Sequence, residues 1–190
     1  MSRFSLLASA AVATLLLASI PASAESMSEK TVNVGGAPMY PSKNIVQNAV
    51  NSKDHTTLVA AVKAAGLVDT LQSAGPFTVF APTNAAFAKL PAGTVDNLVK
   101  PENKDTLTKI LTYHVVPGRL TAVALMKAIK DGEGTAKFKT VAGGDIWINQ
   151  AGPGKLSVTD AKGDVATVTI PDVLQSNGVI HVIDTVLLPM

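Results

Sequence analysis

The pattern of apolar and polar positions divides the 190-residue chain into a helical first part and a strand-rich second part. Between residues 42 and 72, apolar positions recur at the spacing of an α-helix. Ser42 and Asp54 are residue types that cap helix N-termini, and Gly66 is the type that ends a helix. We therefore expect one helix after each cap, and one further helical turn over residues 67–72.

The middle of the chain alternates between strand-like and helical segments. Residues 77–81 are aromatic, β-branched or small and lie between two prolines, which predicts a buried strand. Thr83 or Asn84 can cap the helix that follows. Pro101 suits the first turn of a helix over residues 101–111, and residues 113–116 then predict a short strand.

The chain beyond residue 120 is dominated by short strand-like runs. A small helix near residues 121–130 comes first, and glycine-containing turns separate the runs that follow. Because the helices precede most of the strands, we expect a single α+β domain rather than a doubly wound parallel sheet. The five runs cover residues 137–141, 145–149, 155–159, 165–170 and 179–187.

The first 24 residues have the pattern of a secretory signal peptide. A basic start at Arg3 precedes an apolar run that ends at Ile20, and small residues lead up to Ala24. The run has about 15 residues, fewer than the ~20 that span a bilayer. We therefore expect cleavage after Ala24, export to the periplasm or the medium, and no membrane span in the mature chain.

The predicted mature chain divides into two parts. Residues 25–41 begin with polar residues and contain two glycines and two prolines, which predicts a loose N-terminal lead-in. Residues 42–190 are then the folded domain, and their length suits one hydrophobic core.

Composition narrows the classes of function. Sixteen Lys and Arg residues against 14 Asp and Glu leave a formal charge of +2, and the aromatic residues are few, so we expect no nucleic-acid partner. The chain has no cysteine, so its core is held without disulfides, and thiolate ligands and a lipid-modified cysteine are excluded.

The sequence carries no recognisable catalytic motif. It has neither a Gly-x-Ser-x-Gly elbow nor a phosphate-binding loop. We therefore expect that the protein is not an enzyme and binds no cofactor. His55, His114 and His181 are its only soft metal ligands, and none has a metal-ligand spacing. Two strands could bring His114 and His181 together, which a metal-dependent enzyme would need. Hydrogen bonding of each imidazole within the core is the interpretation that we favour, and we expect no metal.

Three segments together resemble the homology boxes of the fasciclin (FAS1) family. Residues 77–87 (FTVFAPTNAAF) resemble the first box, 111–118 (LTYHVVPG) the tyrosine–histidine motif, and 177–189 (NGVIHVIDTVLLP) the second box. Their order and separation fit the family over about residues 42–189, and the resemblance extends to its single-domain exported bacterial members. The first box often has Asp where this chain has Asn84, and either residue can cap a helix.

The resemblance implies a fold, a role and a set of residues. The fold is a wedge-shaped β-sandwich with helices packed along one side, and the role is non-catalytic adhesion to a cell-surface or matrix protein or a glycan. A weakly self-associating structural or stress-related envelope protein without a foreign ligand is the alternative. The binding residues that the resemblance implies are Tyr113, His114, Asn84 and Thr83. Its structural motif residues are Phe77, Phe80, Pro82, Phe87, Asn177, Gly178, His181 and Asp184.

Three further features have two interpretations each. In a strand, Tyr113 and His114 would point to opposite faces, so we expect one in the core and the other nearer the surface or the adjoining helix. Trp147 either packs on the sheet, which we favour, or anchors a binding contact. Residues 162–164 (KGD) resemble short integrin-binding loops, but the same residues are typical of an ordinary hairpin turn, the interpretation that we favour.

Overall fold

The structure, a computed structural model, describes residues 30–190. The predicted signal peptide over residues 1–24 lies outside the described residues. No helix within residues 30–190 is long and apolar enough to cross a membrane.

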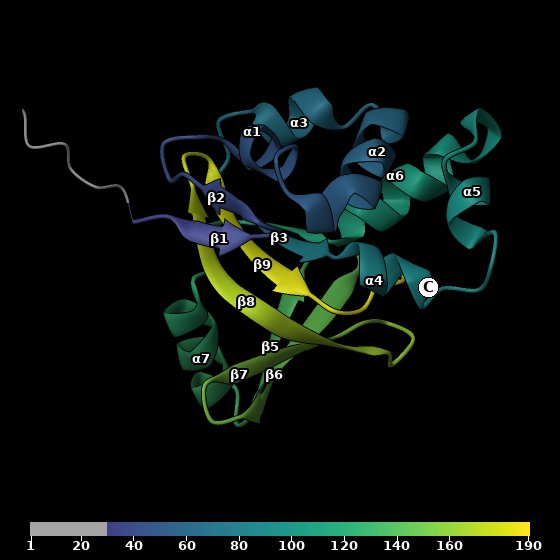
Figure 1. Ribbon diagram of the computed structural model, residues 1–190. Coiled ribbons are helices and arrows are strands. Elements are labelled where there is room, and N and C mark those ends of the chain that lie inside the picture. The colour runs from purple at the N-terminus through teal and green to yellow at the C-terminus, as the bar shows by residue number, and fades with distance from the viewer. Residues whose placement is uncertain (1–29) are drawn as a thin grey trace, which may run out of the picture.

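A seven-stranded mixed sheet runs through the molecule in the order β4-β3-β9-β8-β7-β6-β5 (Figure 1). Neighbouring strands are antiparallel except for β3 and β9, which are parallel. β9, the last strand in sequence, therefore lies inside the sheet between β3 and β8. The strands are β3 (Phe77–Pro82), β4 (Val115–Pro117), β5 (Thr135–Lys139), β6 (Asp145–Gly152), β7 (Lys155–Thr159), β8 (Val165–Gln175) and β9 (Gly178–Ile183).

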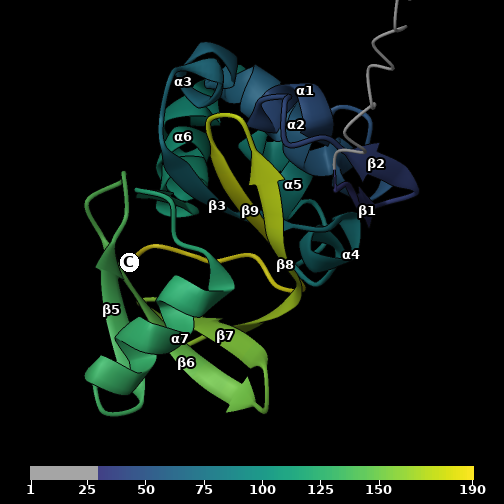
Figure 2. The ribbon, with the colours of Figure 1, turned by 90° about the vertical axis from the view of Figure 1, so that its left-hand side faces the viewer.

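The long strand β8 joins the two halves of the sheet. Its first residues pair with β7, and its later residues pair with β9. The pairing with β9 shifts register between Val168 and Ile170 and again between Ile170 and Val173. Because such bulges bend a strand and increase its twist, β3 and β9 lie in one layer and β5, β6 and β7 in another (Figure 2).

Helices cover the first of these layers. The helices α1 to α6 gather beside β3 and β9, whereas α7 packs against β5 and β6 (Figures 1 and 2). Helices in the first part and strands in the second confirm the predicted α+β class. The helices are α1 (Ile45–Ala49), η1 (Lys53–His55), α2 (Thr56–Ala65), α3 (Val68–Gln72), α4 (Asn84–Ala88), α5 (Thr94–Leu98), η2 (Pro101–Asn103), α6 (Lys104–Tyr113) and α7 (Ala122–Asp131).

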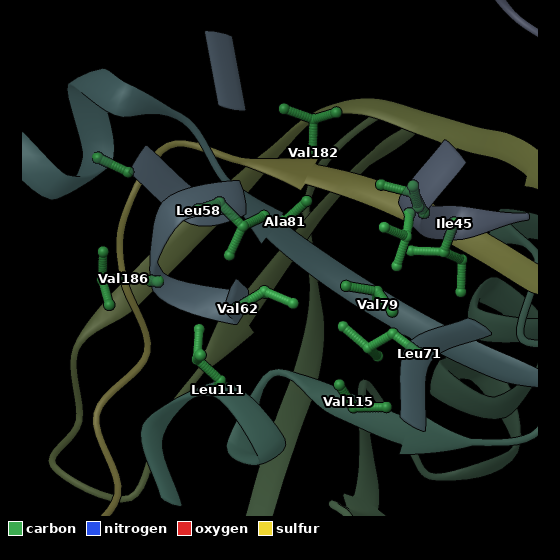
Figure 3. Close-up of a cluster of buried hydrophobic side chains, with 14 of the residues drawn as sticks. Ile45, Leu58, Val62, Leu71, Val79, Ala81, Leu111, Val115, Val182 and Val186 are labelled. Atoms are coloured by element: carbon green, nitrogen blue, oxygen red, sulfur yellow. The ribbon is translucent and has the colours of Figure 1, made fainter. Parts of the chain in front are cut away.

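Two hydrophobic cores lie on opposite faces of β3. Val79 and Ala81 point into the core between the sheet and the helices, where they join Leu58, Val62 and other side chains (Figure 3). Phe80, between them in sequence, points into the second core inside the sandwich. A strand that is buried on both faces is apolar throughout, which is why residues 77–81 carry so clear a strand signal.

Most predicted elements are present, but two of the predicted helix caps are wrong. Helix α1 begins after Asn44, not Ser42. The Asn44 side chain accepts a hydrogen bond from the Gln47 N–H (2.9 Å), and the Gln47 side chain accepts one from the Asn44 N–H (3.0 Å). This reciprocal pair satisfies two N–H groups at the helix start, which a lone serine does not. Asp54 lies within η1 and caps no helix.

The predicted lead-in is more ordered than its composition suggested. β1 (Val32–Val34) and β2 (Ala37–Met39) form a hairpin around Gly35-Gly36, and both glycines adopt the positive φ that such a tight turn requires. Val34 and Met39 are buried in the helix-side core. The hairpin therefore packs as part of the domain.

Candidate functional site

The tyrosine–histidine motif lies at the end of a helix. Tyr113 is the last residue of α6 and His114 is its C-cap, so β4 begins only at Val115. The predicted strand over residues 113–116 was therefore wrong at its first two positions. Tyr113 and His114 are 0% and 2% exposed, so neither approaches the surface. Of the two places expected for the second residue, the surface is wrong, and the His114 ring bonds to Ile110 of the helix α6.

The Tyr113 side chain links three segments. Its hydroxyl donates a hydrogen bond to the Asp145 carbonyl of β6 and accepts one from the Ala161 N–H (3.0 Å). Its ring lies against Gly144 so closely that a Cβ atom there would be 2.7 Å from the ring. Burial raises the pKa of Tyr113, so the hydroxyl stays protonated and keeps both bonds. Tyr113 thus joins α6 to the β5–β6 and β7–β8 connections.

The His114 imidazole uses both of its nitrogens on the backbone. Nδ1 donates to the Ile110 carbonyl (2.8 Å), and Nε2 accepts from the Leu187 N–H (2.9 Å). A carbonyl can only accept and an N–H can only donate, so these partners select the neutral ring with its proton on Nδ1. Burial lowers the pKa of His114 to about 4, although the Ile110 carbonyl and the Asp160 charge oppose the shift.

His181 in β9 has the opposite tautomer and a separate set of partners. Its Nε2 donates to the Leu120 carbonyl (2.7 Å), and its Nδ1 accepts from the Asp172 N–H (3.4 Å). The ring stacks on Phe80, with 5.6 Å between the ring centroids. Burial lowers the pKa of His181, against the Leu120 carbonyl and the Asp172 charge.

These contacts give the metal hypothesis no support. Each nitrogen of His114 and His181 already has a backbone partner, and the two rings bond to different segments. Within residues 30–190, no group of three or more His, Asp or Glu side chains could hold a metal ion. Backbone hydrogen bonding within the core, the interpretation that the sequence favoured, is what the structure has at both positions.

Asn177 and Gly178 join the second box to the helices. The Asn177 side chain accepts from the Ile45 N–H (3.1 Å) and donates to the carbonyls of Leu71 (2.8 Å) and Ser73 (2.9 Å). A Cβ atom on Gly178 would lie 2.0 Å from the Phe77 carbonyl oxygen. The close approach of β9 to β3 therefore requires glycine at this position.

The first box caps its own helix and contacts an earlier segment of the chain, η1 and α2. Thr83 is the N-cap of α4, and its side chain accepts from the Ala86 N–H. Asn84 accepts from the Thr57 N–H (3.0 Å) and donates to the Lys53 carbonyl (2.8 Å). Thr83 and Asn84 are half-buried. The Thr83 side chain thus caps α4 itself, and the Asn84 side chain holds α4 against η1 and α2.

The other residues of the boxes are packing positions or hydrogen-bond acceptors. Phe80, Pro82 and Phe87 are buried, and Phe77 is half-buried. Asp184 accepts from the Thr167 N–H (2.8 Å). Partial burial alone would raise the pKa of Asp184, but this bond, the Thr185 hydroxyl and the Lys89 charge together lower it.

A groove of about 350 Å³ opens beside Tyr113 and combines aromatic, cationic and anionic side chains. Trp147 is half-exposed there, and the Lys137 ammonium lies 5.7 Å from the centroid of its ring. Lys137 also pairs with Asp145 (2.9 Å). The residues that line the groove are Lys109, Tyr113, Ala142, Gly144, Asp145, Trp147, Ala161, Pro189 and Met190.

Sequence reasoning identified Trp147 and Tyr113 but missed most of this groove. Lys109 comes from α6, Asp145 from β6 and Pro189 from the C-terminal segment, and only the fold brings them together. The one local signal was Asp145, which precedes Trp147 by two residues in the predicted strand and so shares its face.

The KGD segment forms an exposed turn between β7 and β8. The Asp160 carboxylate accepts from the N–H groups of Lys162 and Asp164, each at 2.9 Å. Gly163 adopts a φ of +90°. These are features of an ordinary turn, which agrees with the interpretation that the sequence favoured.

Comparisons with known proteins agree with the family resemblance. The model of the family described as "Fasciclin domain" matches residues 53–189. Protein sll1483 of Synechocystis is 49% identical over 162 residues, which are 85% of this chain and 82% of that protein. Immunogenic protein MPB70 of Mycobacterium bovis is 37% identical over 174 residues, 89% of this chain and 74% of that protein.

A solved structure confirms the predicted fold. The FAS1 domain pair from the insect cell adhesion molecule Fasciclin I superimposes with a TM-score of 0.68 at 22% identity. The match covers 78% of this chain and 52% of that two-domain chain, so this chain spans about half of its length. Because the family model matches residues 53–189 and two relatives share more than a third of their aligned residues with it, the chain belongs to the Fasciclin domain family.

Proposed function

We propose that this protein is an exported, non-catalytic binding module that contacts a cell-surface protein, a matrix protein or a glycan through the Trp147 groove. The carrying observation is the contrast between the family motifs and this groove. Both ring nitrogens of His114 and of His181 bond to the backbone, whereas the groove presents Trp147, Asp145 and Lys109 in one place.

The groove combines side chains that suit recognition. Tryptophan is enriched among residues that dominate binding energy, because it offers a large apolar surface together with an N–H donor. Asp145 and Lys137 at its edge add an acceptor and a donor whose ion pair is partly open to solvent. Such a surface suits a partner with both apolar and hydroxyl or amide groups, such as a glycan or a peptide loop.

The binding residues implied by the resemblance take an indirect role in this proposal. Tyr113 lines the groove, and its hydroxyl holds the Asp145 and Ala161 segments on either side. His114 fixes the end of the same helix through Ile110 and Leu187. Thr83 caps α4, and Asn84 fixes α4 against η1 and α2. Substitutions at these positions would then weaken binding through the shape of the domain.

Family membership supports the same role. Fasciclin I, whose domain pair shares this fold, is a cell adhesion molecule. The predicted signal peptide agrees with a place outside the cytoplasm, in the periplasm or the medium. The proposed role needs no catalytic group.

A binding experiment with two variants tests the proposal. The mature chain is titrated onto immobilised cell-surface, matrix-protein and glycan preparations, together with Trp147→Ala and Val123→Ala. Val123 is 77% exposed on α7 and does not line the groove, so it is the matched control. We expect saturable binding that Trp147→Ala weakens by at least 10-fold, about 1.4 kcal/mol or more, and that Val123→Ala leaves unchanged.

Two outcomes would contradict the proposal. If the wild type binds no preparation, the domain has no such partner, and sedimentation at rising concentration would then test the self-association alternative. If Trp147→Ala binds as the wild type does, the contact lies elsewhere on the domain.

A further inference from the structure

The sheet face that carries Trp147 continues beyond the groove. Because side chains alternate along a strand, Ile146 and Ile148 of β6 point into the core, where both are 0% exposed. Trp147 and Asn149 point to the opposite, outer face and are partly open to solvent. The helix α7, which Figure 2 shows beside β5 and β6, packs through Leu125 into that same core, so it lies on the inner side of this layer. The outer face is therefore a surface that extends the groove.

A row of neutral hydrogen-bonding side chains crosses this face next to Trp147. Thr135 of β5 lies opposite Asn149 of β6, and Thr159 of β7 lies opposite Trp147. The Thr135 hydroxyl donates to the Asn149 side-chain oxygen (2.6 Å), and the Asn149 amide donates to the Thr159 hydroxyl (3.2 Å). Within residues 30–190, no partner takes the Thr159 hydroxyl proton or the second Asn149 N–H. Both remain available as donors to a ligand.

The charges beside Trp147 are nearly balanced. Lys137 and Asp145 pair with each other (2.9 Å), and the Lys109 ammonium at the groove donates to the Met190 carbonyl (3.0 Å). The row next to the indole consists of hydroxyl and amide groups. A polyanion or a polycation would need a cluster of like charges of the opposite sign, and this surface does not supply one. The groups present favour an uncharged partner that forms many hydrogen bonds.

The groove has room for a sugar ring against the indole. Its volume is about 350 Å³, whereas a cavity of ~150 Å³ holds a benzene molecule. Trp147 lines the groove, but Lys137, whose ammonium lies 5.7 Å from the centroid of the indole ring, does not. The cation therefore holds the indole without filling the groove. The C–H groups on one side of a pyranose ring are slightly positive and the face of an aromatic ring is negative, so the two surfaces attract each other.

We propose that the partner of the Trp147 groove is a neutral β-1,4-linked glycan, an extended ribbon with flat C–H faces. One sugar ring stacks on Trp147, and the next bonds to Asn149 and Thr159. This inference rests on the proposed function and names its ligand. Sugar hydroxyls both donate and accept, as threonine hydroxyls and the asparagine amide do. A bound peptide strand instead pairs its backbone with a free sheet edge, and β6 is an inner strand between β5 and β7.

The fluorescence of Trp147 reports on this site directly, because the chain has one tryptophan. The mature chain is titrated with three neutral tetrasaccharides, cellotetraose, chitotetraose and mannotetraose, and with a sulfated heparin tetrasaccharide as the anionic control. We expect at least one neutral sugar to change the emission saturably, and the heparin fragment to leave it unchanged. The affinity for the neutral sugar should change little with added salt, because screening acts on ionic contacts.

Two neighbouring residues of β6 provide a variant and its matched control. Asn149→Ala should weaken binding of the neutral sugar about 3- to 10-fold, the value of one net hydrogen bond. Gln150→Ala should leave it unchanged, because Gln150 alternates to the other face and bonds to the Gly152 carbonyl. Trp147→Ala, measured by calorimetry, should weaken binding at least 10-fold. Thermal unfolding checks that all three variants are folded.

The outcomes distinguish this inference from the proposed function. The glycan inference is overturned if no neutral sugar changes the emission, if only the heparin fragment does, or if Asn149→Ala and Gln150→Ala bind equally well. If an immobilised protein nevertheless binds the wild type and Trp147→Ala weakens that binding, the proposed function stands and its partner is a protein. If the wild type binds no cell-surface, matrix or glycan preparation, both fail.

Discussion

Acid should destabilise the domain through the buried imidazole of His114. The folded-state pKa of this group is about 4, below its ordinary value of 6.5. As the pH falls, the unfolded chain therefore takes up a proton first. The stability that the neutral ring contributes is fully present above about pH 6.5 and is lost as the pH falls toward 4.

The size of the effect follows from the two pKa values. A shift of one unit corresponds to about 1.4 kcal/mol. Linkage then gives a loss in the free energy of unfolding of about 2 kcal/mol by pH 5 and about 3 kcal/mol by pH 4 from His114 alone. Burial also lowers the pKa of His55 and His181, so their contributions have the same sign and add to the loss.

Urea unfolding followed by the fluorescence of Trp147 measures this effect between pH 7.5 and 4.5. The variant His114→Phe keeps a ring at the position but cannot titrate. We expect it to be less stable than the wild type at pH 7, because the Ile110 carbonyl and the Leu187 N–H lose their partner. Its free energy of unfolding should nevertheless fall less steeply with acid.

Equal slopes for the two proteins across this range would refute the reasoning. So would an NMR titration that places the pKa of His114 near 6.5 in the folded protein. Either result would mean that the ring is hydrated or that protonation is accommodated without unfolding.

Three substitutions test the contacts of the family motifs by urea unfolding at pH 7. Asn177→Ala should cost about 2–4 kcal/mol, because it leaves one N–H and two carbonyls without partners. Asn103→Ala removes one exposed bond and serves as its control, and an equal loss in both would contradict the assignment. Tyr113→Phe should cost about 1–3 kcal/mol and speed hydrogen exchange at the Ala161 amide; an unchanged exchange rate would argue against that bond. Gly178→Ala should cost about 3 kcal/mol or more, since its Cβ meets the Phe77 carbonyl at 2.0 Å. Wild-type stability in this variant would show that β3 and β9 can separate freely.

An element could be predicted from the sequence when the residues that determine it lie close to it along the chain. The strand over residues 77–81 was clear because both of its faces are buried. Thr83 and Thr121 cap helices from adjacent positions, so their segments were also readable. The Asn44–Gln47 pair and the Gly35-Gly36 turn are local signals as well. Both are visible in the sequence, but the prediction did not use them.

The tyrosine–histidine motif was misread because its cause is not local. Tyr113 to Val116 has the composition of a strand, yet the His114 ring bonds back to Ile110 and extends the helical geometry through residue 113. The partner of its other nitrogen, Leu187, is 73 residues away. Strand alternation therefore gave the wrong faces, and burial of both side chains required the complete fold.

The groove could not have been derived from sequence for a related reason. Trp147 lies in a strand where neighbouring residues give no indication of Lys109 or Pro189. The packing of α6, β6 and the C-terminal segment brings these residues together.

The position of β9 has a consequence for how the chain is made. β3 pairs in parallel with a strand about 100 residues further along, and contacts of such long range slow folding. While the ribosome is still producing the last segments, β3 has no partner on that side, and α2, α3 and α6 pack against an incomplete layer. Folding to the native state must wait until residues 178–183 have emerged. For most of its synthesis the polypeptide thus lacks the native sheet, and incompletely folded chains are the form that chaperones bind and that narrow translocation channels accept.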